Sequence, residues 1–540
     1  MNQATINSHS PSHPLLDSPT FLIAPSRNNP DAKPLNQPNP SPNHPNQKSH
    51  QSLWLTLACI LLALATTIFP IARSFLPIEV GYNEGWNINN ASLVTHHAHL
   101  YAAPPAWTTV NYPMLSFALM AALHTLTHDY LYTGRIVSIL SLFACAALIA
   151  AIAHRLGVSR VLAILAAFYT AALFCTDADA YVGMDDPQLL ALAVFLLGLY
   201  VYIRNPTSRL ALTTSALLFV VGGNLKHNPI DIPLAVLIDV TLRNRAHTLY
   251  FALPGLLFAA ASYALNLHFG GPFFLAQILA PRTYSTAKAL DDLVNVFGPL
   301  LIPTLVALYT AWILRRDPTR RIAALLLLTS LFIGGYFGGG VGVSINALFS
   351  AILAVALLIA LFWQRLAETT PRSVQQTALA ASFLWLLIPW LLVAYLITGD
   401  WSPIARYRKA AATQPAFAQQ LALLRSTNGP ALCESILLCT LADKPYLYDP
   451  FNATRLIAFH KLVPTPMLEA LEHHRIAAIQ FNSPLTIELG TERGIEPGNE
   501  RWPPAILEAI KRNYAPALTT STGEIYLPTP RFPTPKLSNP

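Results

Sequence analysis

Apolar segments of about twenty residues follow one another along most of the chain, separated by short polar stretches. Such segments are long enough to cross the hydrocarbon core of a bilayer as helices. A shorter apolar segment at 112–128 ends in His and Thr, and it predicts a helix that lies at the membrane surface. The eleven predicted spans lie at about 53–76, 135–153, 161–176, 187–203, 209–222, 229–242, 248–268, 296–314, 322–337, 343–363 and 377–397.

Two regions outside these spans have a different pattern. Residues 1–50 are rich in Pro, Asn, Ser and His and hold too little apolar surface to offset chain entropy, which predicts a disordered tail. Residues 399–540 alternate short β-type segments, such as 430–435 and 476–482, with amphipathic helical segments. The chain is therefore predicted to consist of a tail (1–50), an all-α polytopic membrane domain (51–398) and a small α/β domain (399–540).

Basic residues gather in the short loops between spans and predict the orientation. By the positive-inside rule, the loops at 154–160, 204–209, 243–247, 315–321 and 364–372 are cytoplasmic. All five fall on the same side as the N-terminal tail only if the segment at 112–128 does not cross. Residues 77–134 then form one long outer loop with an interfacial helix, and the C-terminal domain lies outside the membrane as well.

The composition agrees with this class of protein. Hydrophobic residues make up 53% of the chain and charged residues 11%, with a mean hydropathy of +0.42, whereas soluble domains carry about 25% charged residues. The net charge of +7 is spread over the loops instead of one face, which argues against a nucleic-acid partner. Cys433 and Cys439 lie in the C-terminal domain, where an extracytoplasmic location would permit a disulfide.

The outer loops collect many ionisable side chains, and charges at span ends that face one side predict a functional site. Each has a simpler alternative: Asp185 or Asp186 could cap the helix that follows Pro187, and Arg135 or Lys226 could anchor a helix at the interface. The group comprises Glu79, Glu84, Asp129, Arg135, Asp177, Asp179, Asp185, Asp186, Lys226, His227, Arg282, Lys288, Asp291 and Asp292.

The order of these elements resembles a known family. A first span is followed by "VGYNEGWNINNASLV" (80–94), "NYPMLSFALMAAL" (111–123), "GRIVSILSLFACAALIAAIAHRLG" (134–157) and "DDPQLLALA" (185–193), and the C-terminal domain contains "LADKPYLYDPF" (441–451). From residue 53 onward this is similar to the GT-C superfamily of polyprenyl-phosphate-sugar-dependent glycosyltransferases, in particular bacterial relatives of protein O-mannosyltransferases and aminoarabinose transferases. The resemblance implies a multi-pass protein of the bacterial cytoplasmic membrane, surrounded by membrane lipid. Its partners would be a lipid-linked sugar donor and a protein, lipid or glycan acceptor.

The resemblance also implies roles for individual residues. Members usually carry an Asp-Glu pair in the first outer loop, and this chain has Asn83 and Glu84 in its place. Glu84 is then the candidate general base, which would accept the proton of the acceptor hydroxyl in an inverting, single-displacement transfer. The acidic pair of the second outer loop permits a divalent cation without requiring one. The predicted substrate-binding residues are Tyr82, Asn83, Arg135, Asp185, Asp186, Lys226, His227, Arg282 and Tyr284.

A transporter or flippase of a lipid-linked or polar solute is the alternative function. Transporters commonly contain internal repeats and broken helices near the midplane of the membrane. The two halves of this chain show no convincing repeat, and its polar groups collect at one face. The sequence therefore favours the glycosyltransferase, with Lys226 and Arg282 placed to compensate the charge of a lipid phosphate.

Overall fold

A computed structural model describes residues 45–96, 98–399, 402–485 and 501–530. The chain divides into two units, residues 1–50 and residues 51–540. The predicted disordered tail lies almost entirely outside the described residues. Within the second unit, the helices of the predicted membrane domain and the C-terminal domain belong to one compact body.

Each of the eleven predicted spans coincides with a helix. Among the described residues, seven helices are long and apolar enough to cross a membrane, and an eighth span is obtained if α11 (Thr286–Phe297) and α12, which meet at 96°, are counted together. Because α6, α7 and α8 are shorter, their crossing stays a prediction. The eleven helices are α1 (Pro45–Arg73), α4 (Tyr130–Arg155), α5 (Arg160–Asp177), α6 (Gln188–Arg204), α7 (Arg209–Leu225), α8 (Asp231–Arg243), α9 (Arg245–Leu265), α12 (Leu301–Leu314), α13 (Arg321–Gly338), α14 (Phe349–Thr369) and α15 (Arg372–Thr398).

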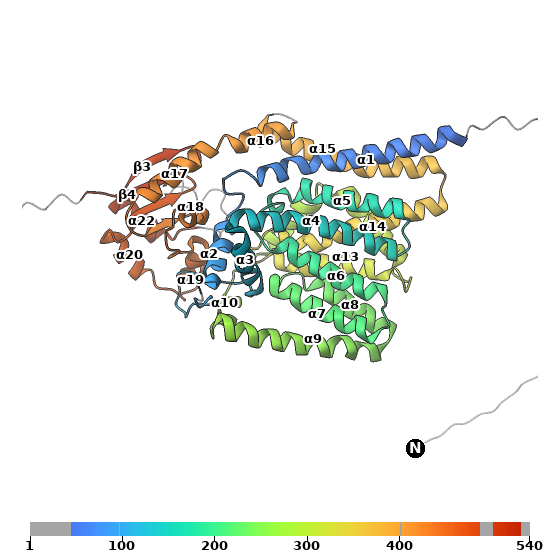
Figure 1. Ribbon diagram of the computed structural model, residues 1–540, viewed down its shortest axis with the longest axis horizontal. Coiled ribbons are helices and arrows are strands. Elements are labelled where there is room, and N and C mark those ends of the chain that lie inside the picture. The colour runs from blue at the N-terminus through green and yellow to red at the C-terminus, as the bar shows by residue number, and fades with distance from the viewer. Residues whose placement is uncertain (1–44, 97, 400–401, 486–500, 531–540) are drawn as a thin grey trace, which may run out of the picture. The chain divides into compact units, whose positions relative to one another are not determined.

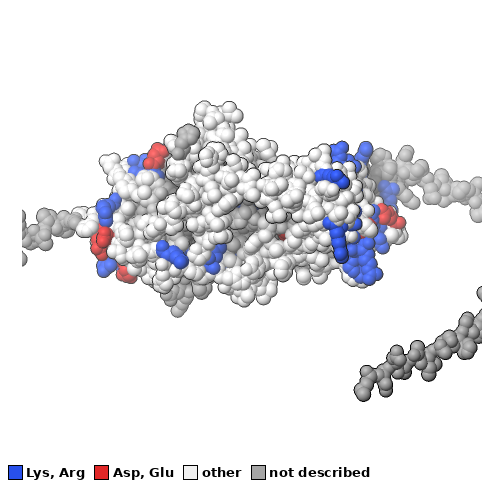
Figure 2. Space-filling view, turned by 90° about the horizontal axis from the view of Figure 1, so that it is seen from below, with Lys and Arg blue, Asp and Glu red and all other residues white. Residues whose placement is uncertain are grey.

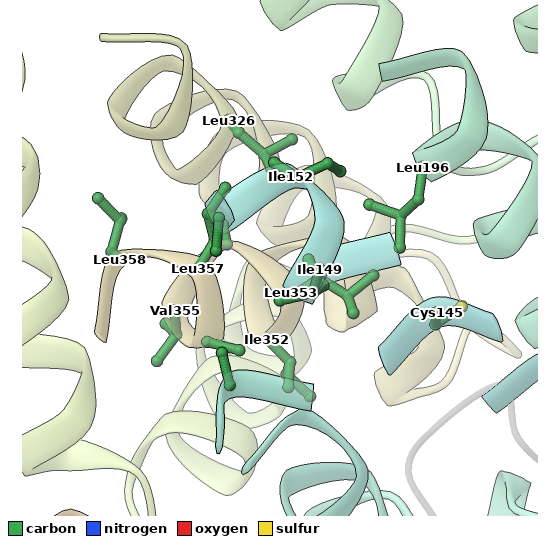
Figure 3. Packing of buried hydrophobic residues seen from close by; sticks show 14 of the residues in the cluster. Cys145, Ile149, Ile152, Leu196, Leu326, Ile352, Leu353, Val355, Leu357 and Leu358 are labelled. Carbon is green, nitrogen blue, oxygen red and sulfur yellow. The ribbon is translucent and has the colours of Figure 1, made fainter. Parts of the chain in front are cut away.

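Helix α14 lies at the centre of the bundle and α9 at its edge (Figure 1). Because α14 is apolar on all sides, it can be surrounded by other helices, and Leu353 and Leu357 pack near Ile149 and Ile152 of α4 (Figure 3). Helix α9 is also apolar but mostly exposed, with Leu256 69% accessible. Such a surface is stable against lipid chains, which are as apolar as Leu.

The basic loops meet at one end of the bundle. Arg320 donates to the carbonyl of Leu156 at 3.0 Å, and Ser159 donates its backbone N–H to Gln364 at 2.9 Å. Asp239, which is fully buried, pairs with Arg243 at the end of α8 and with Arg321 at the start of α13. Figure 2 shows Lys and Arg gathered toward the ends of the molecule with a broad, largely uncharged band between them. The meeting of the basic loops at one end of the bundle agrees with the charge argument. We call the end of the bundle opposite these loops the outer end; its side of the membrane stays a prediction.

Two helices of the long loop cover the outer end of the bundle. Helix α2 spans Asn83–Thr95, and α3 spans Leu115–Thr127, where the surface helix was predicted. Three short elements follow α5, α9 and α13: the 3-10 helix η1 (Asp179–Tyr181), the π-helix η2 (Asn266–Gly270) and the 3-10 helix η3 (Ile345–Leu348). Together with α10 (Phe274–Ile278), these elements place polar loops at the outer end.

The C-terminal domain is a small α/β domain, as predicted. Its four-stranded sheet has the order β1-β2-β4-β3, with β1 and β2 parallel and the other pairs antiparallel. Cys433 and Cys439 form a disulfide. Its elements are α16 (Pro403–Ala411), α17 (Gln414–Ser426), β1 (Ala431–Cys433), α18 (Ile436–Leu441), α19 (Pro450–Ala458), α20 (Thr465–Glu472), β2 (Ala478–Phe481), α22 (Pro504–Asn513), β3 (Tyr514–Thr520) and β4 (Gly523–Pro528).

Close contacts join this domain to the outer loops. Gly85 of α2 lies so near α18 that a Cβ atom there would sit 2.1 Å from the backbone nitrogen of Leu437. Arg406 pairs with Asp179 at 2.5 Å, in the loop between α5 and α6. The domain is therefore positioned to contribute residues to a site at the outer end.

Candidate active site

A cavity of about 870 Å³ lies at the outer end, where membrane loops meet the C-terminal domain. Its walls come from the loop before α2, from Asn111 and Tyr112, from the turns after α5, α7 and α13, and from residues 278–284. Aromatic rings and a few polar side chains line it, which is the usual character of a small-molecule site. The location agrees with the predicted position of the site.

Glu84, the predicted base, is fully buried in an ion pair. Its carboxylate accepts two bonds from Arg135, from Nε at 2.7 Å and from Nη2 at 2.8 Å. The backbone N–H groups of Val80 and Asp185 donate to the same two oxygens at 2.7 and 3.2 Å. Each oxygen thus accepts two bonds, which fills the usual capacity of a carboxylate. Neither Glu84 nor Arg135 lines the cavity.

Arg135 holds the first outer loop in place. Besides its pair with Glu84, its guanidinium donates to the carbonyls of Ser74, Leu76 and Ile78 at 3.0, 2.7 and 2.6 Å. These bonds satisfy its donors and compensate for the loss of water around a side chain that is 1% exposed. The pair therefore fixes the backbone that leads from α1 into α2.

Asp186 is buried, does not line the cavity, and accepts hydrogen bonds from three residues around it. It accepts from Lys226 Nζ at 2.6 Å and from Asn83 Nδ2 at 2.9 Å. It also accepts the backbone N–H of Gln188 at 2.8 Å, at the start of α6, where capping was the alternative interpretation. Asp186 thus positions Asn83 and Lys226, both of which line the cavity.

Asp185 does not line the cavity and lies close to two other carboxylates, those of Glu84 and Asp186. Burial, with Glu84 and Asp186 nearby, raises the pKa of this carboxyl well above its ordinary value. A Cβ atom on Gly134 would lie 2.0 Å from its Oδ1, so the side chain packs tightly against the first turns of α4. Burial and the two neighbouring carboxylates thus disfavour the charged form of Asp185.

Lys226, His227 and Arg282, three of the predicted substrate-binding residues, line the cavity. The ammonium group of Lys226 lies 4.5 Å from the ring centroid of Tyr112, a favourable cation–π distance. Arg282 donates to the carbonyl of Val341 over a long 3.4 Å. Burial, then the charges of Arg282 and Lys226, lowers the pKa of His227 to about 4, so this imidazole is neutral near pH 7.

The other two predicted residues, Tyr82 and Tyr284, also line the cavity. Tyr82 donates its hydroxyl to Asp449 at 2.7 Å, which ties the first outer loop to the C-terminal domain. Tyr284 is 49% exposed, and its ring centroid lies 5.4 Å from that of Tyr336. Six of the ten predicted residues, Tyr82, Asn83, Lys226, His227, Arg282 and Tyr284, therefore line one cavity.

Sequence reasoning missed the contribution of the C-terminal domain. Phe451, Asn452 and Arg501 line the cavity, and the Arg501 guanidinium stacks 4.2 Å from the ring centroid of Tyr82. The Asp-Pro step at Asp449 is a recognisable helix start, and Asp449 does cap α19. That pattern contains no information about the cavity, because the approach to Tyr82 spans 367 residues of sequence.

The described residues contain no group of three or more His, Cys, Asp or Glu side chains arranged to hold a metal ion. Asp185 and Asp186, which the sequence offered as cation ligands, lie behind the cavity wall in the contacts given above. Another acidic residue, Asp292, lines the cavity and pairs with Lys288 at 2.7 Å along α11. A divalent cation therefore stays an untested part of the sequence prediction.

Comparison with known proteins identifies the fold. Searches of protein-family models and of curated proteins gave no match. The crystal structure of ArnT from Cupriavidus metallidurans bound to undecaprenyl phosphate is similar over 88% of this chain and 98% of its own, with a TM-score of 0.52 and 14% identity. The same protein in the apo state gives a TM-score of 0.53, with 12% identity over 89% of this chain and 98% of its own.

An oligosaccharyltransferase from Archaeoglobus fulgidus, tethered to an acceptor peptide, gives a lower TM-score of 0.48, with 12% identity over 89% of this chain and 74% of its own. Because the two ArnT structures are only 14% and 12% identical to this chain, their likeness establishes the architecture. The chemistry has to be argued from the residues of the site. The order of elements along the sequence had predicted the same architecture. The chain therefore has the fold of the ArnT structures, with a helical membrane domain followed by a small α/β domain.

Proposed function

We propose that this protein is an integral-membrane glycosyltransferase that moves a sugar from a polyprenyl-phosphate donor to an extracytoplasmic acceptor by a single, inverting displacement. The observation that carries the proposal is a cationic, aromatic cavity at the outer end of a GT-C fold. A donor with a long isoprenoid tail requires a site that is continuous with the membrane. The acceptor is a protein, lipid or glycan, and the location is the bacterial cytoplasmic membrane.

Arg282 and Lys226 are the groups that we assign to the donor phosphate. Asp186 compensates part of the charge of Lys226, at 2.6 Å, whereas Arg282 contacts a carbonyl oxygen. As the bond to the anomeric carbon breaks, the phosphate oxygen gains negative charge. Preorganised cations stabilise that charge in the transition state without further reorganisation. Arg also offers a planar, bidentate match to phosphate.

The remaining cavity walls suit a sugar. Tyr112 and Trp86 pack edge to face with their centroids 4.9 Å apart, which gives the cavity a rigid aromatic wall. Asn83 and Asn452 supply amide groups that can hydrogen-bond to hydroxyls. Neutral donors and acceptors beside aromatic faces would orient a pyranose while the cations hold the phosphate.

For Glu84 we propose a positioning role instead of the base predicted from sequence. Both carboxylate oxygens already accept two hydrogen bonds, and the cavity wall separates them from the acceptor. Its pair with Arg135 fixes the turn in which Asn83 begins α2, next to Asp186 and Lys226. In this way Glu84 would support the donor site from behind the wall.

The test is transfer from a radiolabelled polyprenyl-phosphate sugar by purified protein in liposomes, with protein, lipid and glycan acceptors. Arg282→Ala is expected to reduce kcat by about 10²–10³-fold, and Arg282→Lys to restore part of it. Arg316→Ala is the matched control, because Arg316 is exposed in a basic loop at the opposite end. Unchanged transfer by Arg282→Ala would refute the phosphate assignment. Passage of the intact donor across the membrane without any transfer would favour the transporter.

A further inference from the structure

The positioning role of Glu84 leaves open which group accepts the proton of an acceptor hydroxyl. Asp186 accepts bonds from Lys226, Asn83 and Gln188 and lies behind the cavity wall. Asp292 lines the cavity, but its Oδ2 accepts a bond from Lys288 at 2.7 Å. The pair with Lys288 occupies one oxygen of Asp292, although burial raises the pKa of this carboxyl, so Asp292 is the carboxylate that the experiment has to separate from other candidates.

His227 offers an imidazole on the cavity wall at the position where α7 ends. The helix stops at Leu225 and Lys226 has an extended backbone, and the successive residues Lys226, His227 and Asn228 line the cavity. The ring of His227 packs edge-on to Tyr112, with the centroids 6.3 Å apart. Tyr112 in turn contacts Lys226, so the imidazole is held beside the cations that we assign to the donor phosphate.

We propose that His227 is the general base of the transfer, an inference that rests on the proposed function. A neutral ring nitrogen of His227 takes the proton of the acceptor hydroxyl while its oxygen bonds to the anomeric carbon. The bond from that carbon to the phosphate oxygen breaks, and the electron pair leaves with the polyprenyl phosphate. The imidazolium then returns its proton to water. No oxidant, metal or covalent intermediate is needed.

The surrounding charges make this base dependent on the donor. In the free protein, burial and the charges of Arg282 and Lys226 disfavour the imidazolium and hold the pKa near 4. Tyr112 is the other titratable group beside the ring. A donor phosphate adds negative charge beside the ring, and a nearby opposite charge stabilises the protonated form. His227 would thus become a stronger base when the donor is bound, and the leaving phosphate would neutralise the new charge.

The experiment compares two nucleophiles in the liposome assay. His227→Ala and His227→Gln are expected to lower kcat with a hydroxyl acceptor by about 10²–10⁴-fold. With azide, which attacks without losing a proton, the same variants should transfer the sugar within about threefold of the wild type. Added imidazoles should restore transfer to hydroxyl acceptors in His227→Ala, with rates that rise with the pKa of the imidazole. His268→Ala is the matched control, because His268 is exposed on η2 and does not line the cavity.

Each outcome bears on one of the two proposals. If the wild type transfers no sugar to either nucleophile, the proposed function fails. If the wild type is active and His227→Gln keeps its rate with hydroxyl acceptors, the ring acts as a hydrogen-bonding group and the base assignment is refuted. An equal loss with azide and with hydroxyls would assign His227 to binding instead. Loss of the hydroxyl reaction alone in Asp186→Asn or Asp292→Asn would move the role to that carboxylate.

Discussion

Substitution of Glu84 by Gln separates the two roles that the sequence and the structure suggest for this residue. A catalytic base can be replaced by its amide with little effect on folding, because the amide has the same shape. In this structure, Glu84 is 0% exposed and its partner Arg135 is 1% exposed. The amide would leave the guanidinium without its counter-charge inside the protein. We therefore expect Glu84→Gln to destabilise the protein.

The magnitude follows from the four bonds that Glu84 accepts. The amide oxygen can replace one carboxylate oxygen, but the amide NH₂ faces two donors, Arg135 Nη2 and the N–H of Val80. Each buried donor left without a partner costs about 1–3 kcal/mol. Breaking a buried ion pair from one side costs about 3–5 kcal/mol in total, a large share of the roughly 5–15 kcal/mol that typically stabilises a domain.

Equilibrium unfolding of the purified protein in mixed micelles, followed by Trp fluorescence, measures this loss. Arg135→Met should cost at least as much, because it also frees three carbonyls, and the double variant should show a coupling energy above 1 kcal/mol. Glu508→Gln, at an exposed position of α22, is the control. The reasoning is refuted if Glu84→Gln unfolds like the wild type while transfer falls by about 10²–10⁴-fold, because that pattern defines a base.

Three further predictions test the contacts and the orientation. Gly85→Ala should destabilise the protein by about 1–3 kcal/mol, because a Cβ there meets the backbone of α18, whereas Gly223→Ala, with nothing within 4 Å, should not; thermal unfolding of both would decide. Burial raises the pKa of Glu79 from 4.5 to about 7, so its contribution to stability is present below pH 4.5 and lost as the pH rises through 7. Glu79→Gln should therefore flatten the fall in stability between pH 5 and 8, and an unchanged pH profile would contradict the shift. Finally, an impermeant maleimide should label Lys511→Cys in intact cells and Thr207→Cys only after permeabilisation; both positions are exposed and the three free cysteines are buried, and the reverse result would invert the orientation.

Much of the fold was predictable because membrane helices are encoded locally. A run of about twenty apolar residues suffices for a span, and basic loops group at one end through charge alone. The strands at 430–435 and 476–482 of the C-terminal domain were also predicted from local pattern. The order of the strands in the sheet was not predictable. Strand β4 lies between β2 and β3, and no local pattern indicates which strands pair.

The sequence indicated the loops that surround the cavity, but not the contacts within them. Charges at the outer span ends lie in these loops, and six of the ten predicted residues line the cavity; their roles stay predictions. The sequence could not show that Arg135 would neutralise Glu84, since 51 residues separate them and the contact depends on how α2 docks against α4. It also could not show that Arg501 of the C-terminal domain reaches Tyr82. Contacts between distant segments decide which charges are free for chemistry.

The geometry of one helical turn explains why Asn83, and not the predicted base Glu84, faces the cavity. Successive residues of an α-helix point about 100° apart, so Asn83 and Glu84, at the start of α2, face different surroundings. Asn83 faces the cavity, and Glu84 faces the interior and Arg135. An Asp at position 83 would place a second carboxylate about 3 Å from that of Asp186, with only Lys226 to compensate both, and like charges so close cannot both ionise readily. Asn83 donates its amide to Asp186 instead. The cavity wall therefore carries an amide at the point where the resemblance to GT-C members implies an acid. If the proposed function holds, the proton of the acceptor would pass to a group elsewhere in the cavity.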